Sequence, residues 1–314
     1  MSALAETIGF IFGLVALGYL TGLAGVLRDE AGEALTDFAT TIALPVLLFR
    51  TVSTSEFGHV APWTLWAAYF TAAAASWALG QFVTARVFGR DRRAAIIGGI
   101  AAGFSNLVLL GLPFMQGVFG HDGVSVLSLL VAVHMPIMLG VSVLLFALAD
   151  KESGSTAAAE ALQFLKALAG NPLIIGIVLG LAWRLTGLAM PALGTRMIDT
   201  FASVAGPLAL FAMGLGLRRF GVTANFAPGL VLSLIKLTFM PAVALGMALL
   251  LGLPPLAAKV VVVAAGLPVG VNPYLFATRF GTGQALSSNA LTIGTVLAAA
   301  TTAMWLAIAE RVFG

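Results

Sequence analysis

The stretch Asp37-Phe-Ala-Thr-Thr-Ile-Ala-Leu-Pro45-Val-Leu-Leu-Phe49 returns in the second half of the chain as Asp199-Thr-Phe-Ala-Ser-Val-Ala-Gly-Pro207-Leu-Ala-Leu-Phe211. The aspartate, the proline and the final phenylalanine keep the same spacing in both copies. Two further segments, 101–120 and 264–281, both begin with Ala-Ala-Gly and end with Phe-Gly. Equivalent positions lie 161 to 163 residues apart. Two similar halves in an apolar chain are typical of secondary transporters, in which matching broken helices indicate the binding site.

The composition predicts an integral membrane protein. Of the 314 residues, 60% are hydrophobic and 9% are charged, and the mean hydropathy is +1.05. Soluble domains carry about 25% charged residues. The absence of cysteine excludes a disulfide framework and thiolate chemistry. Because the basic residues lie mainly in the expected loops, we interpret the pI near 9.6 as a membrane-orientation signal and not as nucleic-acid binding.

Helix lengths predict the fold class, because an apolar helix needs about 20 residues to cross a bilayer. We predict ten spans, at 6–26, 34–53, 62–86, 94–118, 123–148, 167–188, 197–217, 226–251, 256–279 and 285–310. The first is expected to be a retained helix and not a signal peptide, because Met1 to Glu6 contains no Lys or Arg. The prediction is an all-α membrane protein with a five-helix repeat at 1–149, a cytoplasmic linker at 150–166 and a second five-helix repeat at 167–314. Five is odd, so the second repeat must be inverted.

Loop charges predict the orientation. With the N-terminus outside, the inner loops carry ten Lys and Arg residues and the outer side carries five. Basic residues concentrate on the cytoplasmic side of membrane proteins. We therefore expect both termini outside and the linker inside.

The fourth and ninth predicted spans contain matching interruptions. They read Gly-Phe-Ser-Asn-Leu-Val-Leu-Leu-Gly-Leu-Pro at 103–113 and Gly-Leu-Pro-Val-Gly-Val-Asn-Pro-Tyr at 266–274. Proline removes a backbone donor and clashes with the carbonyl four residues back. Unwound backbone inside a bilayer is tolerated only where it is buried in protein or lines a wet cavity. The pattern predicts broken crossover helices near the midplane, although simple kinking of packed helices remains an alternative.

The breaks suggest an anionic ligand. Each second half-helix would begin with unpaired N–H groups and about half a positive charge, and antiparallel spans would bring two such ends together. Neither break contains Asp or Glu, so a tightly bound Na⁺ or a carboxylate proton relay is less favoured. The predicted substrate-binding residues are Ser105, Asn106, Asn272, Pro273 and Tyr274.

Four further residues are candidates for a charge or coupling role. Lys236, inside the eighth span, either balances substrate charge or has a structural role, capping a carbonyl or pairing with an aspartate. Asp37 and Asp199 are expected in the first turns of spans 2 and 7, where the helix dipole favours a carboxylate; proton coupling is the alternative. His134 is either a hydrogen-bonded core residue or a pH sensor.

Several function classes lack their sequence signals. We find no metal-ligand pair, no Gly-x-Ser-x-Gly elbow and no phosphate-binding loop. We therefore expect no enzyme activity, no metal and no other cofactor, and no ATP-driven pumping by this chain alone.

Five motifs in order resemble the auxin efflux carrier family, which includes plant auxin carriers and bacterial carriers labelled malonate, malate or lactate transporters. They cover essentially the whole chain: Ala43-Leu-Pro45-x-Leu-x-Phe49, Asn106-x-x-x-x-Gly111-x-Pro113, Asn171-Pro172, Phe211-x-x-Gly214-Leu and Leu267-Pro-x-Gly270-x-x-Pro273-x-x-Phe276-Ala277. The resemblance implies a bile-acid-symporter-like fold in which spans 4 and 9 cross at the substrate site. It also implies a scaffold of spans 1, 2, 6 and 7 that forms homodimers, and an elevator-type transport domain of spans 3–5 and 8–10.

The chain departs from the plant members at two positions. Ser105 stands where they have the crossover proline of span 4, and Asn272 replaces an apolar residue before the second proline. These differences suit a bacterial organic-acid carrier of the inner membrane better than an auxin carrier.

The sequence thus predicts a secondary active transporter of small organic anions, driven by the membrane potential, the substrate gradient or protons. One alternative is a sodium-coupled symporter of the bile-acid carrier type, which would need acidic residues clustered near the crossover. The other is a passive channel or sensor on the same scaffold.

Overall fold

The computed structural model describes residues 3–54, 61–149, 166, 169–220 and 226–314. Throughout these ranges the secondary structure is helical and contains no strand. The chain forms two compact units. Unit 1 comprises Met1–Gly58, Val108–Gly140 and Glu152–Arg218, and unit 2 comprises His59–Leu107, Val141–Lys151 and Arg219–Gly314. Each unit therefore contains segments from both sequence halves. Apart from Lys166, the predicted linker lies outside the described residues.

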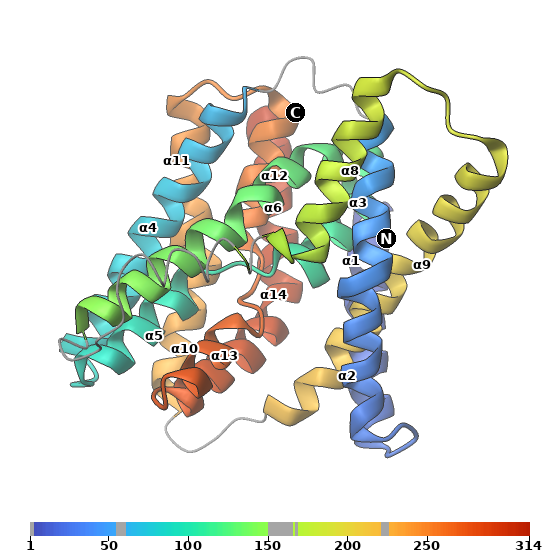
Figure 1. The fold of residues 1–314 in the computed structure, drawn as a ribbon. Coiled ribbons are helices and arrows are strands. Elements are labelled where there is room, and N and C mark those ends of the chain that lie inside the picture. The colour runs from blue at the N-terminus through green and yellow to red at the C-terminus, as the bar shows by residue number, and fades with distance from the viewer. Residues whose placement is uncertain (1–2, 55–60, 150–165, 167–168, 221–225) are drawn as a thin grey trace. The chain divides into compact units, whose positions relative to one another are not determined.

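Unit 1 is a bundle of long apolar helices. A continuous helix runs through α2 (Asp29–Phe38), the π-helical turn η1 (Ala39–Ala43) and α3 (Leu44–Thr54). Helix α1 (Ala3–Leu23) packs along α9 (Ala192–Leu217), and α3 packs along α8 (Pro172–Thr186), as Figure 1 shows. The unit also holds the first part of α6 (Leu112–Ala149).

Small residues allow the helices of unit 1 to approach closely. A Cβ added to Gly176 would lie 2.5 Å from the carbonyl oxygen of Pro45, and one added to Gly180 would lie 2.7 Å from that of Phe49. A larger side chain at either position would separate α8 from α3, because the nearest atom is a backbone carbonyl oxygen that cannot move aside. Close contact through glycines four residues apart is a common way of packing helices in membranes.

Unit 2 contains the remaining long helices and the two predicted breaks. Helix α4 (Pro62–Arg86) packs against α5 (Arg92–Gly103) and α11 (Met240–Leu250), as Figure 1 shows. Helix α14 (Gln284–Phe313) packs against α10 (Phe226–Leu234) and α12 (Pro255–Gly266). Short helix α13 (Asn272–Arg279) and the π-helical turn η4 (Ile235–Phe239) complete the unit.

Helical residues fall within every predicted span, but some helix ends differ. Within the described parts of the chain, six helical segments are long and apolar enough to cross a membrane, while α8 and α12 are shorter apolar helices. An integral membrane protein is thereby supported, and the ten-span inverted repeat remains a prediction. The left-handed conformation of Gly120 (φ 62°) divides α6 where spans 4 and 5 were expected to separate.

The predicted first-turn positions of two aspartates are wrong. The helix of Asp37 begins at Asp29, and the helix of Asp199 begins at Ala192, so each carboxylate lies about two turns inside its helix. The helix dipole acts on charges within the first turn. The helix dipole therefore does not account for the position of either carboxylate.

Three π-helical turns precede prolines, and the sequence did not predict them. η1 ends two residues before Pro45, η2 (Leu107–Gly111) two before Pro113, and η4 two before Pro241. Because proline cannot donate a backbone hydrogen bond and clashes with the preceding turn, a widened turn there accommodates its ring.

Candidate substrate site at the helix breaks

Both predicted breaks are present, and both lie in unit 2. Helix α5 ends at Gly103 and α12 ends at Gly266, which are equivalent positions of the two halves. The next residues, Phe104 and Leu267, are extended, with ψ of 115° and 148°. Residues 104–106 and 267–271 are not helical. The prediction of both interruptions from the glycines and prolines in the sequence is therefore confirmed.

The two breaks contact each other. The backbone N–H of Asn106 donates to the carbonyl oxygen of Pro268 at 2.9 Å. A Cβ added to Gly270 would lie 3.3 Å from Cγ of Asn106, so the second break passes directly beside the Asn106 amide. Segments about 160 residues apart are thus joined at one point, as crossover helices require.

Ser105 and Asn106 are buried at this contact, with exposed fractions of 1% and 8%. The hydroxyl of Tyr69, in α4, lies beside the Ser105 side chain, although their geometry falls short of a regular hydrogen bond. Ser105 Oγ makes no regular hydrogen bond with any residue that the structure describes. A buried polar atom of this kind needs an explanation, and a functional role or a bound water or ion is among the recognised ones.

The remaining three predicted residues open α13. Asn272 and Tyr274 are half-buried and Pro273 is buried. The Tyr274 ring packs edge-on against Phe220, with centroids 4.8 Å apart. The break therefore combines a partly exposed amide with an aromatic pair. This pair could not be predicted from local sequence, because Phe220 lies far away in the chain.

The expectation of unpaired N–H groups needs correction. The Asn106 N–H is used by Pro268, the Leu107 N–H donates to Ser105, and the N–H groups of Tyr274 and Leu275 donate to Val271. These backbone donors are occupied within the protein: the Asn106 N–H bonds to the other break, and the remaining three bond within their own turns. Polar contacts with a ligand would therefore come chiefly from side chains.

Two side chains hold the ends of the first half-helices. Ser76 Oγ, from α4, donates to the carbonyl of Ala102 at 2.7 Å, and Lys236 Nζ, from η4, donates to the carbonyl of Ala265. Ala102 and Ala265 are equivalent positions, each one residue before the last helical glycine. Each donor comes from the span before the break in its own half. This satisfies carbonyls that a helix end otherwise leaves without a partner.

Lys236 is thus in contact with a carbonyl, one of the structural alternatives considered for it, while a role in charge balance or coupling remains a prediction. Sequence reasoning missed Ser76. The internal repeat could have identified Ser76, because it lies 160 residues before Lys236, close to the 161–163-residue offset between equivalent positions.

The other three candidates lie in unit 1 and not at the breaks. Asp37 is exposed on α2, and His134 is buried in α6 with 2% exposure. Asp199 forms an ion pair with Arg50, with Oδ1 and Nε 2.6 Å apart. Proton coupling through these residues remains a prediction.

Residues 3–306 match the family described as membrane transport protein. The chain belongs to the membrane transport protein family. It is the family of the auxin efflux carriers, as the five motifs predicted.

Three relatives differ in the share of this chain that they match. A protein of Rhizobium meliloti (strain 1021) named "Putative malonate transporter" is 28% identical over 313 residues, covering 95% of this chain and 94% of the relative. Auxin efflux carrier component 3a of Oryza sativa subsp. japonica is 28% identical over 134 residues, covering 41% of this chain and 22% of the relative. The lysosomal cholesterol signaling protein of Mus musculus is 26% identical, covering 65% of this chain and 24% of the relative.

Proposed function

We propose that this membrane transport protein is a secondary active transporter of small organic anions, with its substrate site at the two helix breaks. The observation that carries the proposal is the hydrogen bond from Asn106 to Pro268, which joins the breaks of both halves inside one compact unit. Binding sites of secondary transporters form where matching discontinuous helices meet.

The chemistry of the breaks supports an anion. Ser105 supplies a hydroxyl, and Asn106 and Asn272 supply amide groups, all of which can donate hydrogen bonds to a carboxylate. Both breaks lack Asp and Glu, whose oxygens would suit a bound cation instead. The relative from Rhizobium meliloti is named for malonate, a carboxylate, and it matches this chain over nearly its full length.

An elevator-type mechanism would move the site as one body. In this proposal, spans 1, 2, 6 and 7 form the scaffold and spans 3–5 and 8–10 carry the substrate, driven by membrane potential, the substrate gradient or protons. Support comes from the location of all five predicted binding residues in unit 2, whereas residues 108–140 of spans 4 and 5 belong to unit 1. A homodimer through the scaffold, an inner-membrane location and outward-facing termini belong to the same proposal.

The test is charge movement by the purified protein in proteoliposomes. Malonate, malate, lactate and indole acetate are added singly, with and without Na⁺ at a fixed pH, and counterflow of labelled substrate is measured in parallel. We expect saturable transport of at least one carboxylate that is indifferent to Na⁺. Transport that appears only with Na⁺ would instead establish the bile-acid-type symporter, and the absence of both currents and counterflow would refute a carboxylate transporter.

A sensor function is the second candidate, because the mouse relative is named as a signaling protein and aligns with 65% of this chain. A sensor would bind its ligand at the breaks without moving it across the bilayer. Saturable binding to the detergent-solubilised protein, combined with no counterflow in proteoliposomes, would distinguish this function from transport.

A further inference from the structure

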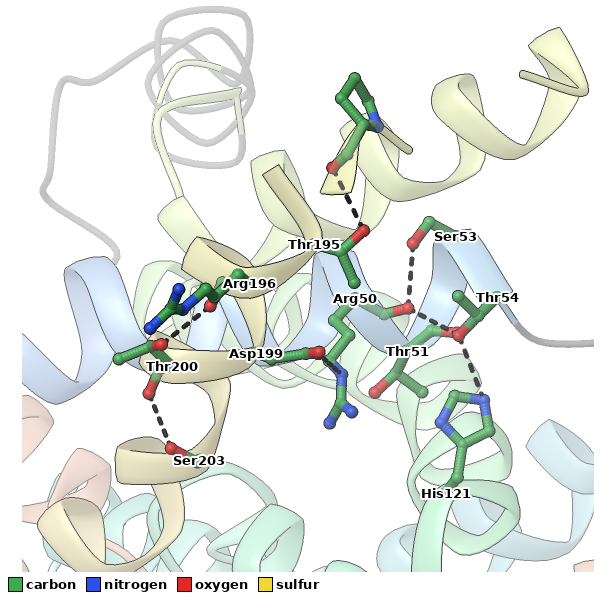
Figure 2. Close-up of polar contacts among 11 residues, drawn as sticks. Arg50, Thr51, Ser53, Thr54, His121, Thr195, Arg196, Asp199, Thr200 and Ser203 are labelled. Atoms are coloured by element: carbon green, nitrogen blue, oxygen red, sulfur yellow. Dashed lines mark hydrogen bonds and ion pairs between the residues drawn. The ribbon is translucent and has the colours of Figure 1, made fainter. Parts of the chain in front are cut away.

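Unit 1 contains a cavity of about 510 Å³ that the proposed transport site does not use. It lies between the end of α3, the end of α8, the start of α9 and the beginning of α6 after Gly120. Figure 2 shows its polar side, where Arg50, Thr54, His121 and Asp199 approach one another. Small-molecule sites typically enclose about 300–1,000 Å³.

Arg50 offers donors to this cavity beyond its ion pair. Its Nε contacts Oδ1 of Asp199 at 2.6 Å, and the two side chains are 43% and 46% exposed. Figure 2 shows the two terminal nitrogens of the guanidinium pointing away from the Asp199 carboxylate. They donate to no described residue. Because a guanidinium carries five N–H donors in a planar fork, the unused edge matches a second carboxylate.

The charges lining the cavity favour an anion. Among the described residues that line the cavity, Arg50 and Arg184 carry guanidinium groups and Asp199 carries a carboxylate. His121 adds an imidazole whose Nε2 lies 3.4 Å from the hydroxyl of Thr54. Positive charge in a partly enclosed pocket raises the local concentration of anions.

Other residues that line the cavity are apolar. They are Trp183, Leu188, Met190 and Ile198, which come from the end of α8, the connection to α9 and the first turns of α9. A lining that combines basic and apolar side chains suits a ligand with a carboxylate at one end and a hydrocarbon or aromatic body at the other.

We propose that this cavity is a second ligand site, which binds a small monocarboxylate with an apolar body independently of the helix breaks. The ligand carboxylate takes the open edge of Arg50 and the charge of Arg184, and the body packs on Trp183. Asp199 competes with the ligand for Arg50 and so keeps the affinity low. Under the predicted orientation the cavity opens to the outside.

Site-specific labelling tests this proposal cleanly, because the chain contains no cysteine. Ala189→Cys places one thiol in the cavity lining, and Leu193→Cys places one on the 72% exposed Leu193 outside it. The rate of maleimide modification is measured in a neutral detergent with increasing benzoate, and with the neutral isostere benzamide. We expect benzoate, but not benzamide, to slow modification at position 189 saturably and to leave position 193 unaffected.

Second substitutions in the Ala189→Cys background locate the binding. Arg184→Gln should raise the half-protecting benzoate concentration about tenfold, since the positive charge that attracts the ligand carboxylate is lost, and Asp199→Asn should lower it. Arg311→Gln, which removes an exposed guanidinium in unit 2, should change nothing. The opposite signs of the first two effects separate ligand binding from simple misfolding.

Four outcomes would overturn the proposal, the fourth being loss of protection in Asn272→Ala. The first is equal protection at both labelled positions, and the second is protection that Arg184→Gln leaves unchanged. The third is protection by phosphatidylglycerol but not by benzoate, which would indicate a lipid headgroup site. Protection that persists in Asn272→Ala supports independence from the helix breaks, and its loss there would show that benzoate acts through the transport site.

Discussion

The backbone N–H of Asn106 and the carbonyl of Pro268 are hydrogen-bonded at 2.9 Å, and this bond joins the two helix breaks of the chain. The Asn106 N–H is a donor that would have no partner at an isolated helix start. The Pro268 carbonyl has no helical partner because residues 267–271 are not helical. The Asn106 side chain is thereby held beside Gly270 at the crossing point. The proposed transport site is built around this backbone contact.

Asn106→Ala and Asn272→Ala should each abolish carboxylate uptake while the protein stays folded. Each removes an amide that we assign to the substrate, and losing a hydrogen bond to a charged group costs about 1.5–3 kcal/mol of binding. Uptake into proteoliposomes and the melting temperature should be measured together.

Asn171→Ala is the matched control, because Asn171 caps α8 in unit 1 through the Leu173 N–H. It should lower stability by about 1 kcal/mol and retain uptake. Normal uptake by both site variants would refute the assignment.

Gly270→Ala should impair uptake by crowding the crossing point. Its Cβ would meet Cγ of Asn106 at 3.3 Å, a contact that requires the amide or the loop to shift. Overpacking of this kind costs about 1–3 kcal/mol. Gly246→Ala, on an exposed face of α11 with open space around it, is the control and should transport normally. Both variants add one methyl group, so an equal effect in the two would contradict the role of Gly270.

Ser76→Ala should destabilise unit 2 through the end of α5. The carbonyl of Ala102 loses its side-chain donor in a buried setting, and leaving a buried acceptor unpaired costs about 1–3 kcal/mol. Thermal unfolding followed by circular dichroism measures the change. Ser203→Ala removes an exposed hydroxyl that bonds within its own helix, and its melting temperature should match that of the parent protein.

Two substitutions of Lys236 separate its structural contact from a role in charge balance. Lys236→Met keeps the length but removes the donor to Ala265, so both stability and uptake should fall. Lys236→Gln retains a donor without the charge. If the lysine acts mainly by holding the end of α12, as we expect, glutamine restores more stability and uptake than methionine does. A glutamine variant that is as stable as the parent but inactive would instead assign the charge to substrate binding.

The positions of the helix interruptions follow from local sequence. Glycine and proline act on their own turn, so Gly103 and Gly266 end their helices for reasons that can be read locally. The Asn171-Pro172 start of α8 and the break at Gly120 have the same local character. The repeat offset identified the two breaks as equivalent, and the composition established the membrane class.

Which groups contact one another depends on the tertiary packing of the helices. The pairing of Asn106 with Pro268, of Ser76 with Ala102 and of Arg50 with Asp199 joins residues that the sequence separates by 26 to 162 positions. The structure also shows that the backbone N–H groups of Asn106, Leu107, Tyr274 and Leu275 at the breaks are already hydrogen-bonded. Asp37 and Asp199 lie about two turns inside their helices. A local pattern fixes the conformation of a turn, but hydrogen bonds and ion pairs between distant segments depend on how the helices pack, which no single segment encodes.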